Sequence, residues 1–153
     1  MSDRLQAEAL LREYGDVTGL GALAFDDEGH CRLEFNERVL VDIAFDEPRG
    51  AIVLMTPLGE VRLDERPELA ADMLDANALW RGTRGATLGI DRASGLAVLA
   101  LAVPLAGLEL GRLESRVDEF VGTAGRWLDR VVATADSGNV SNGDRADPLQ
   151  MRV

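Results

Sequence analysis

The sequence predicts an α+β fold: a twisted antiparallel sheet of about five strands with three helices, in the order α-β-β-β-α-β-β-α. Apolar residues alternate with a period of two in two separate blocks, and segments of helical period lie before, between and after these blocks. The chain has 153 residues, about one domain by the usual prior, and 46% of them are apolar, enough for one buried core. We therefore expect an α+β domain at 1–135 and a flexible tail at 136–153.

The first helix is predicted to run from Asp3 to Val17. Its apolar residues fall on one helical face, and Ser2 or Asp3 can cap its start. Leu5 lies roughly opposite that face, so we expect it to be exposed. Several glycines then end the helical period.

The first block of alternation predicts a meander of three strands, or four if Leu23–Phe25 pairs as a strand of its own. After a turn-rich segment, apolar residues at 31, 33 and 35 alternate with polar ones. Further strands are expected at 39–45 and 52–55. The last of these is apolar on both faces, as in a strand that is covered on both sides.

The second helix is predicted to begin at Pro67, because proline is favoured in the first turn of a helix. One broad apolar face continues through Trp80, and Gly82 follows. Residues 86–90 and 96–103 then predict a hairpin. Its second strand is again apolar on both sides.

The third helix has the clearest pattern, a single apolar stripe from Leu110 to Val131. After Ala135 the sequence becomes polar and rich in turn-forming residues. This composition predicts the flexible tail at 136–153.

Charge and composition exclude several classes of partner. The net charge is −11 and all 16 basic residues are arginine. A chain this acidic repels polyphosphate and anionic lipids, so we expect neither nucleic acid nor a membrane as a partner. Between Asp26 and Glu47 there are eight acidic residues and two arginines, a local charge of −6. The start of the chain shows no secretory signal, and the single cysteine fits a reducing cytoplasm.

Residues suited to catalysis are scarce. Gly19–Ala24 matches the dinucleotide pattern G-x-G-x-x-A, but a helix precedes it and a strand follows, the reverse of the required context. His30 and Cys31 are the only imidazole and thiol, and neighbours on a strand point to opposite faces. The acidic turn at 26–30 lacks the ligand spacing of an EF-hand. We predict no catalytic, cofactor or metal site. A small cytoplasmic ligand-binding domain or enzyme, or an adaptor that regulates transcription through a partner, is the alternative.

The chain also has more apolar residues than one sheet face requires. Segments 52–55 and 96–103 are apolar on both faces, and Leu5, Leu40 and Leu79 are expected to point outward. Either loops and the third helix cover these side chains, or they form an interface with another protein.

The order of these motifs resembles the Tir-chaperone family, the class I chaperones of bacterial type III secretion. The resembling segments are Leu20–Phe35, Met73–Asn77, Gly85–Asp91, and Val103–Leu105 leading to Phe120, Val121 and Trp127. Together they extend from about Leu5 to Val131, so that only the tail lies outside the resemblance.

The resemblance implies a bacterial cytoplasmic homodimer without enzymatic activity or cofactor. Such a protein binds the N-terminal region of a secreted effector and keeps it non-globular and export-competent. The resemblance places the dimer interface on the second helix, at Leu74, Asn77, Ala78, Trp80 and Arg81. Since a disordered partner loses entropy on binding, the chaperone must offer a large apolar area. We expect effector contacts at Leu5, Leu33, Phe35, Leu40 and Val41, and a complex that weakens with salt.

Overall fold

The computed structural model describes the backbone of residues 2–150 and the side-chain environments of residues 2–133. The helices are α1 (Asp3–Thr18), α2 (Pro67–Asn77), the short 3₁₀ helix η1 (Ala78–Trp80) and α3 (Leu110–Gln150). The strands are β1 (His30–Phe35), β2 (Val39–Asp46), β3 (Ala51–Glu60), β4 (Thr87–Asp91) and β5 (Leu96–Pro104). This order of elements confirms the predicted fold class.

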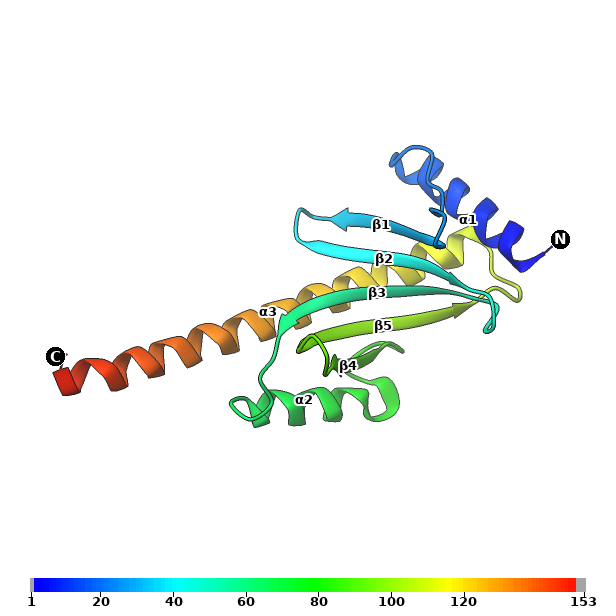
Figure 1. Cartoon of the computed structure of the whole chain (residues 1–153). Helices are drawn as coiled ribbons and strands as arrows, with labels where there is room; N and C mark the ends of the chain where they lie inside the picture. The colour runs from blue at the N-terminus through cyan, green and yellow to red at the C-terminus, as the bar shows by residue number, and fades with distance from the viewer. Residues whose placement is uncertain (1, 151–153) are drawn as a thin grey trace.

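The five strands form one antiparallel sheet in the order β1-β2-β3-β5-β4 (Figure 1). The hairpins β1–β2 and β4–β5 therefore lie at the two edges, and the long strands β3 and β5 pair in the centre. In the first hairpin, Asn36 and Glu37 have left-handed φ values of 54° and 58°. Positive φ at both central residues is the feature of type I′ hairpin turns, whose twist matches that of the strands.

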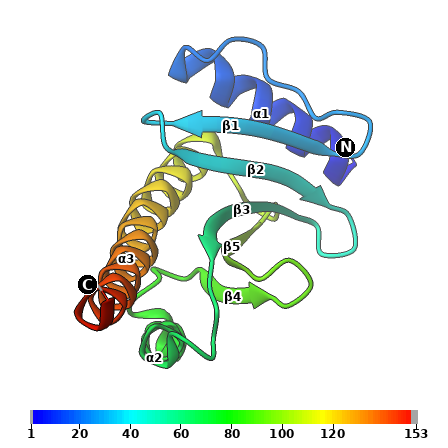
Figure 2. The same ribbon diagram turned by 60° about the vertical axis from the view of Figure 1, so that its left-hand side comes forward.

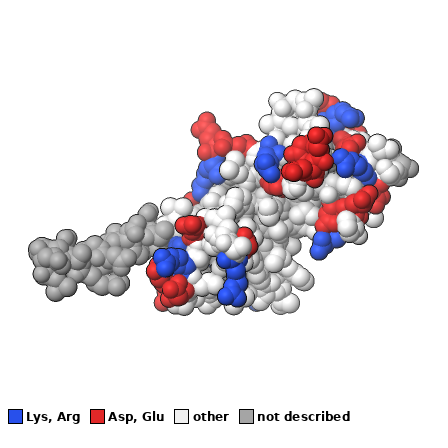
Figure 3. Space-filling view, viewed as in Figure 1, with Lys and Arg blue, Asp and Glu red and all other residues white. Residues whose placement is uncertain are grey.

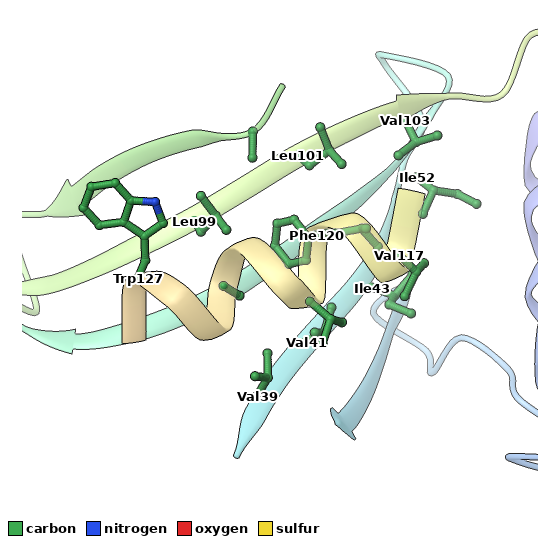
Figure 4. Packing of buried hydrophobic residues seen from close by; sticks show 14 of the residues in the cluster. Val39, Val41, Ile43, Ile52, Leu99, Leu101, Val103, Val117, Phe120 and Trp127 are labelled. Atoms are coloured by element: carbon green, nitrogen blue, oxygen red, sulfur yellow. The ribbon is translucent and has the colours of Figure 1, made fainter. Parts of the chain in front are cut away.

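The helix α3 covers one face of the sheet, and the other two helices lie at its ends. Two views show α1 beside β1 and α2 beside β4, with α3 running across the sheet (Figures 1 and 2). In the core, Phe120 and Trp127 of α3 face strand residues that include Val41 and Leu99 (Figure 4). The indole Nε1 of Trp127 donates to the carbonyl of Gly82 at 3.2 Å, so its polar atom is satisfied although the ring is buried.

The segment Leu23–Phe25 is not a strand, so the meander has three strands rather than four. The segment still lies beside β1, because the backbone N–H of Asp26 donates to the carbonyl of His30 at 2.8 Å. The turn that follows closes through the Asp26 carboxylate, which accepts from the backbone N–H groups of Glu28 and His30. These hydrogen bonds lower the pKa of Asp26.

The last helix is longer than expected. Its backbone is helical through Gln150, whereas the polar composition after Ala135 predicted a tail. No proline interrupts the sequence between Leu110 and Pro148, and glycine and asparagine weaken a helix without forbidding it. The division into a domain at 1–135 and a tail at 136–153 stays a prediction, and residues 151–153 lie outside the described residues.

Candidate partner-binding surfaces

The α2–η1 segment carries the two most exposed large apolar side chains in the described part of the chain. Leu74 and Leu79 are 72% and 75% exposed, and Trp80 is 56% exposed. Ala78 and Arg81 are exposed beside them. We call the surface formed by Leu74, Ala78, Leu79, Trp80 and Arg81 the α2 edge. Four of these five residues were expected in a dimer interface, and Leu79 adds to them.

The backbone of the α2 edge is strained at its most exposed point. Leu79 and Trp80 are consecutive non-glycine residues with φ of 56° and 54°. Such left-handed conformations cost on the order of 1–3 kcal/mol per residue and persist only where the surrounding structure enforces them. Hydrogen bonds within the chain hold this turn, because the N–H of Gly82 donates to the carbonyl of Ala76 at 3.2 Å and the Gly82 carbonyl accepts from Trp127.

Asn77 has a different role from its expected neighbours in the interface. Its side-chain amide donates to the carbonyl of Leu88 at 2.9 Å and accepts from the backbone N–H of Leu88 at 2.8 Å. The amide thus occupies the place of a neighbouring strand at the free edge of β4. This pair of hydrogen bonds fixes the end of α2 against the sheet and leaves the Asn77 amide engaged within its own chain.

The five residues expected to contact an effector do not form one surface. Leu33 and Phe35 of β1 are half-buried and lie on the same sheet face as Val41, which is 1% exposed and belongs to the core. Val41 therefore presents no surface to a partner in this structure. Leu40 is 53% exposed on the opposite face of the sheet, and Leu5 is 56% exposed on α1.

Among the described residues, no helix packs on that opposite face of the sheet (Figures 1 and 2). Apolar side chains of three central strands form most of it, namely Leu40, Ala44, Val53, Met55, Val98, Ala100 and Ala102, and we call these seven residues the open sheet face. The Asp42 carboxylate lies on the same side of β2, opposite Met55. The register places Ala44, Val53 and Ala102 in one row across the strands. All seven side chains are at least partly exposed. Sequence reasoning named only Leu40 as a contact residue, although the two-sided apolar pattern of 52–55 and 96–103 contained the signal for five of the others, on β3 and β5.

A cavity of about 510 Å³ lies at one end of the open sheet face. Its lining combines apolar residues of the sheet with charged residues of the β1 start, the β2–β3 turn and α1; these are Ala44, Phe45, Val53 and Met55 with Arg4, Glu28, His30, Asp42, Asp46 and Glu47. His30 Nδ1 lies 2.8 Å from a carboxylate oxygen of Asp42. Asp46 accepts hydrogen bonds from the Arg49 side chain and backbone, which lower the pKa of Asp46. The cavity is therefore apolar on its floor and acidic on its rim.

Charge is distributed unevenly between the two halves of the chain. Residues 2–65, which include α1 and β1–β3, contain fifteen acidic residues and six arginines, a net charge of −9. Residues 66–133 contain nine acidic residues and eight arginines, a net charge of −1. Figure 3 shows charged side chains of both signs over α1 and the first strands and, separately, over the region of α2, with a largely uncharged band between them. The acidity is thus a property of the cavity's side of the molecule.

The residues considered for catalysis are not brought together. Gly19–Ala24 lies in the connection between α1 and β1, and no helix follows it. Cys31 is buried on the core side, where desolvation raises the pKa of its thiol and disfavours the reactive thiolate. Among the described residues, no cluster of three or more His, Cys, Asp or Glu side chains could hold a metal ion. No helix in the described part of the chain is both long and apolar enough to cross a membrane.

Comparison with known proteins assigns the family. Residues 9–128 match the model of the Tir chaperone protein (CesT) family, which is most of the chain. The chain belongs to this family. Among curated protein sequences, no significant match was found.

Solved structures of similar fold agree with membership in the Tir chaperone family. A chain of the ExsC–ExsE complex superimposes with a TM-score of 0.71 at 24% identity, covering 84% of this chain and 96% of that one. A chain of the HopA1–SchA chaperone–effector complex gives 0.69 at 21% identity, with 82% and 95% covered. A chain of the complex between the Yersinia pestis type III secretion chaperone SycH and a fragment of YscM2 gives 0.62 at 16% identity, with 78% and 98% covered. At these identities the likeness shows a shared fold.

Proposed function

We propose that this member of the Tir chaperone family is a homodimeric type III secretion chaperone. In this proposal it binds the N-terminal region of a secreted effector in the bacterial cytoplasm and keeps it soluble and export-competent, without catalysis or a bound cofactor. The observation that carries the proposal is the presence of two uncovered apolar surfaces, the α2 edge and the open sheet face, on a fold whose core is complete without them. Family membership and the chaperone–effector complexes among proteins of similar fold support it.

The α2 edge is the surface that suits a second copy of the chain. A two-fold contact sets the same residues of both copies against each other, so a highly charged surface would repel itself. The half of the chain that contains the α2 edge has a net charge of only −1. We therefore propose that Leu74, Ala78, Leu79, Trp80 and Arg81 form the dimer contact, with Asn77 holding α2 in position.

The acidic half suits an extended partner with apolar and basic residues. Leu5 and Leu40 are exposed there, and Leu33 and Phe35 lie half-buried on β1. β1 is an edge strand whose start is bonded to Asp26, and the rest of its edge can accept a further strand. A partner that drapes over several separate patches stays non-globular while bound. Its affinity arises from many modest contacts, because ordering a disordered segment costs entropy.

Co-expression tests the function directly. The full chain is expressed with a secreted effector encoded beside it, and we expect a soluble complex that contains two copies of the chain and protects an N-terminal segment of the effector from proteolysis. The complex should weaken as salt is raised, because screening reduces the attraction between acidic and basic groups. Failure to bind the N-terminal segment of any secreted protein would contradict the proposal.

Substitution tests the α2 edge. Leu74→Ser combined with Leu79→Ser should raise the dimer dissociation constant at least 100-fold, about 2.7 kcal/mol, because it removes two anchors at the centre of the contact. Sedimentation velocity over a dilution series measures this constant. Val17→Ser with Leu20→Ser is the matched control, since both side chains are exposed and lie on or after α1. A wild-type monomer, or an equal effect of the control, would count against this interface.

A further inference from the structure

We propose that the cavity at the end of the open sheet face is a docking subsite for an arginine or lysine side chain of an amphipathic segment, whose apolar side chains lie along that face. The inference rests on the proposed function, because the segment belongs to the secreted partner. It specifies what the proposed function leaves open: which face the partner crosses and what chemistry fixes its register.

The open sheet face has the shape for an extended or helical segment. Three central strands, spaced about 4.8 Å apart, make a strip roughly 10 Å wide, which matches the diameter of a helix or of a strand with its side chains. Small side chains form its floor, including Ala44, Ala100 and Ala102, so a partner's backbone can approach closely. Leu40 and Met55 are the larger residues on this face and are 53% and 39% exposed.

The charge at the end of this strip is not neutralised within the chain. Asp42 is occupied by His30, and Asp46 by Arg49. Arg4, the other cation of the lining, pairs with Glu8 at 2.9 Å. In contrast, Glu28 and Glu47 form no ion pair with any residue in the described part of the chain. Two exposed carboxylates thus remain to receive a cation whose aliphatic stem packs on Phe45 and Val53.

Charge complementarity decides between the occupants of this face. A second copy related by a two-fold axis would bring acidic rims towards each other. The chain's own residues 134–153 contain three aspartates and two arginines, so that segment is acidic as well. A basic amphipathic segment of a partner matches both the apolar strip and the acidic rim.

A peptide titration tests the subsite. The probe is a fluorescently labelled ten-residue peptide of alternating leucine and lysine, acetylated at its N-terminus and amidated at its C-terminus, and the full chain is the receptor. We expect Glu28→Gln with Glu47→Gln to weaken binding about tenfold at low salt. Ala102→Gln, which fills the apolar strip without changing charge, should weaken it at least fivefold. Glu13→Gln with Asp64→Asn is the matched control, since both residues are exposed and unpaired, and it should change binding less than twofold.

Zero-length carbodiimide cross-linking locates the probe independently. The chain contains no lysine, so apart from its own N-terminus every new amide bond must join one of its carboxylates to a lysine of the peptide. Mass spectrometry should find these bonds concentrated on Glu28 and Glu47. Cross-links spread over all acidic residues, or equal weakening by the two double variants, would show general attraction to an acidic protein and overturn the subsite.

Two further outcomes separate this inference from the proposed function. If Ala102→Gln converts a wild-type dimer into monomers, the open sheet face is a contact between copies and the subsite is wrong. If co-expression yields an effector complex that is unaffected by Glu28→Gln with Glu47→Gln and by Ala102→Gln, the function stands and this subsite falls. If no effector complex forms at all, the function itself fails, whatever the peptide titration gives.

Discussion

The open sheet face and the α2 edge are both apolar and uncovered, but they differ in charge and in backbone. Four of the seven residues of the open sheet face, and all the residues that line the cavity at its end, lie in residues 2–65, which have a net charge of −9; small residues held in regular register form the floor of the face. The α2 edge belongs to a half of net charge −1 and presents bulky residues on a strained turn. A nearly neutral surface can meet its own copy, whereas an acidic one repels a copy and attracts a basic partner. The difference in charge, more than the apolar area, therefore assigns the α2 edge to a second copy of the chain and the open sheet face to a basic partner.

The two surfaces depend on one shared core, and its loss should have the largest effect. Phe120 lies on the face of α3 that packs against the sheet, and its side chain is 2% exposed. Phe120→Ala should lower the free energy of unfolding by about 3–5 kcal/mol, because a cavity replaces the ring. Urea denaturation measures this change. Val132→Ala, an exposed substitution on the same helix, is the control and should stay within about 0.5 kcal/mol. If Phe120→Ala impaired only dimerisation or only partner binding and left the free energy of unfolding unchanged, the two surfaces would not depend on one shared core.

The packing of α1 against the core should make the free energy of unfolding depend on pH above pH 10. Burial, and then the nearby carboxylates of Asp118 and Glu114, raise the pKa of Tyr14 to about 12. The unfolded tyrosine ionises near pH 10, so stability that is fully present below pH 10 is lost as the pH rises to about 12. The loss should be on the order of 2–3 kcal/mol.

Composition makes this alkaline transition easy to assign. Tyr14 is the only tyrosine and there is no lysine, so few other groups titrate in this range. Chemical denaturation at pH 9 to 12 is measured in a Cys31→Ala background, because the pKa of the Cys31 thiol is also raised. Tyr14→Phe in the same background should remove most of the pH dependence. An unchanged slope in that variant would show that Tyr14 does not link α1 to the core in this way.

The α2 edge should respond to loss of the hydrogen bonds that position it. Asn77→Ala leaves the N–H and carbonyl of Leu88 without their partner and should destabilise the chain by about 2 kcal/mol. Asn77→Asp keeps the acceptor for the Leu88 N–H but sets a carboxylate oxygen against the Leu88 carbonyl, so it should destabilise the chain at least as much as Asn77→Ala. If Asn77→Ala instead left stability unchanged and abolished dimerisation, Asn77 would be a direct contact.

The residues that sequence reasoning located well are those whose roles follow from periodicity. The alternation at 31–35 and 39–45 gave the strands, and the exposure of Leu5 and Leu40 followed from their positions opposite an apolar face. Assigning strands to a face needed the register: Val41 pairs with Leu33 and lies under α3, which no local pattern reveals. The bond from Asn77 to Leu88 and the unpaired state of Glu28 and Glu47 depend on contacts between separate elements, so they became visible only in the structure.

The smallest effect is expected on removal of the part of α3 that follows Ala135. This truncation tests whether that part of the helix contributes to either surface. The buried side chains of α3 end at Val131 in the described part, and Figure 1 shows the helix continuing beyond the sheet. Glycines and asparagines between 138 and 143 each cost up to about 1 kcal/mol in a helix relative to alanine, so isolated helix is poorly supported there. Truncation after Ala135 should therefore change the free energy of unfolding by less than about 0.5 kcal/mol, and amides beyond 135 should exchange hydrogen rapidly in the full chain. If truncation lowers the free energy of unfolding by more than about 1 kcal/mol, or abolishes the dimer, the extension of α3 packs against a second copy of the chain. The dimer contact would then include this extension as well as the α2 edge.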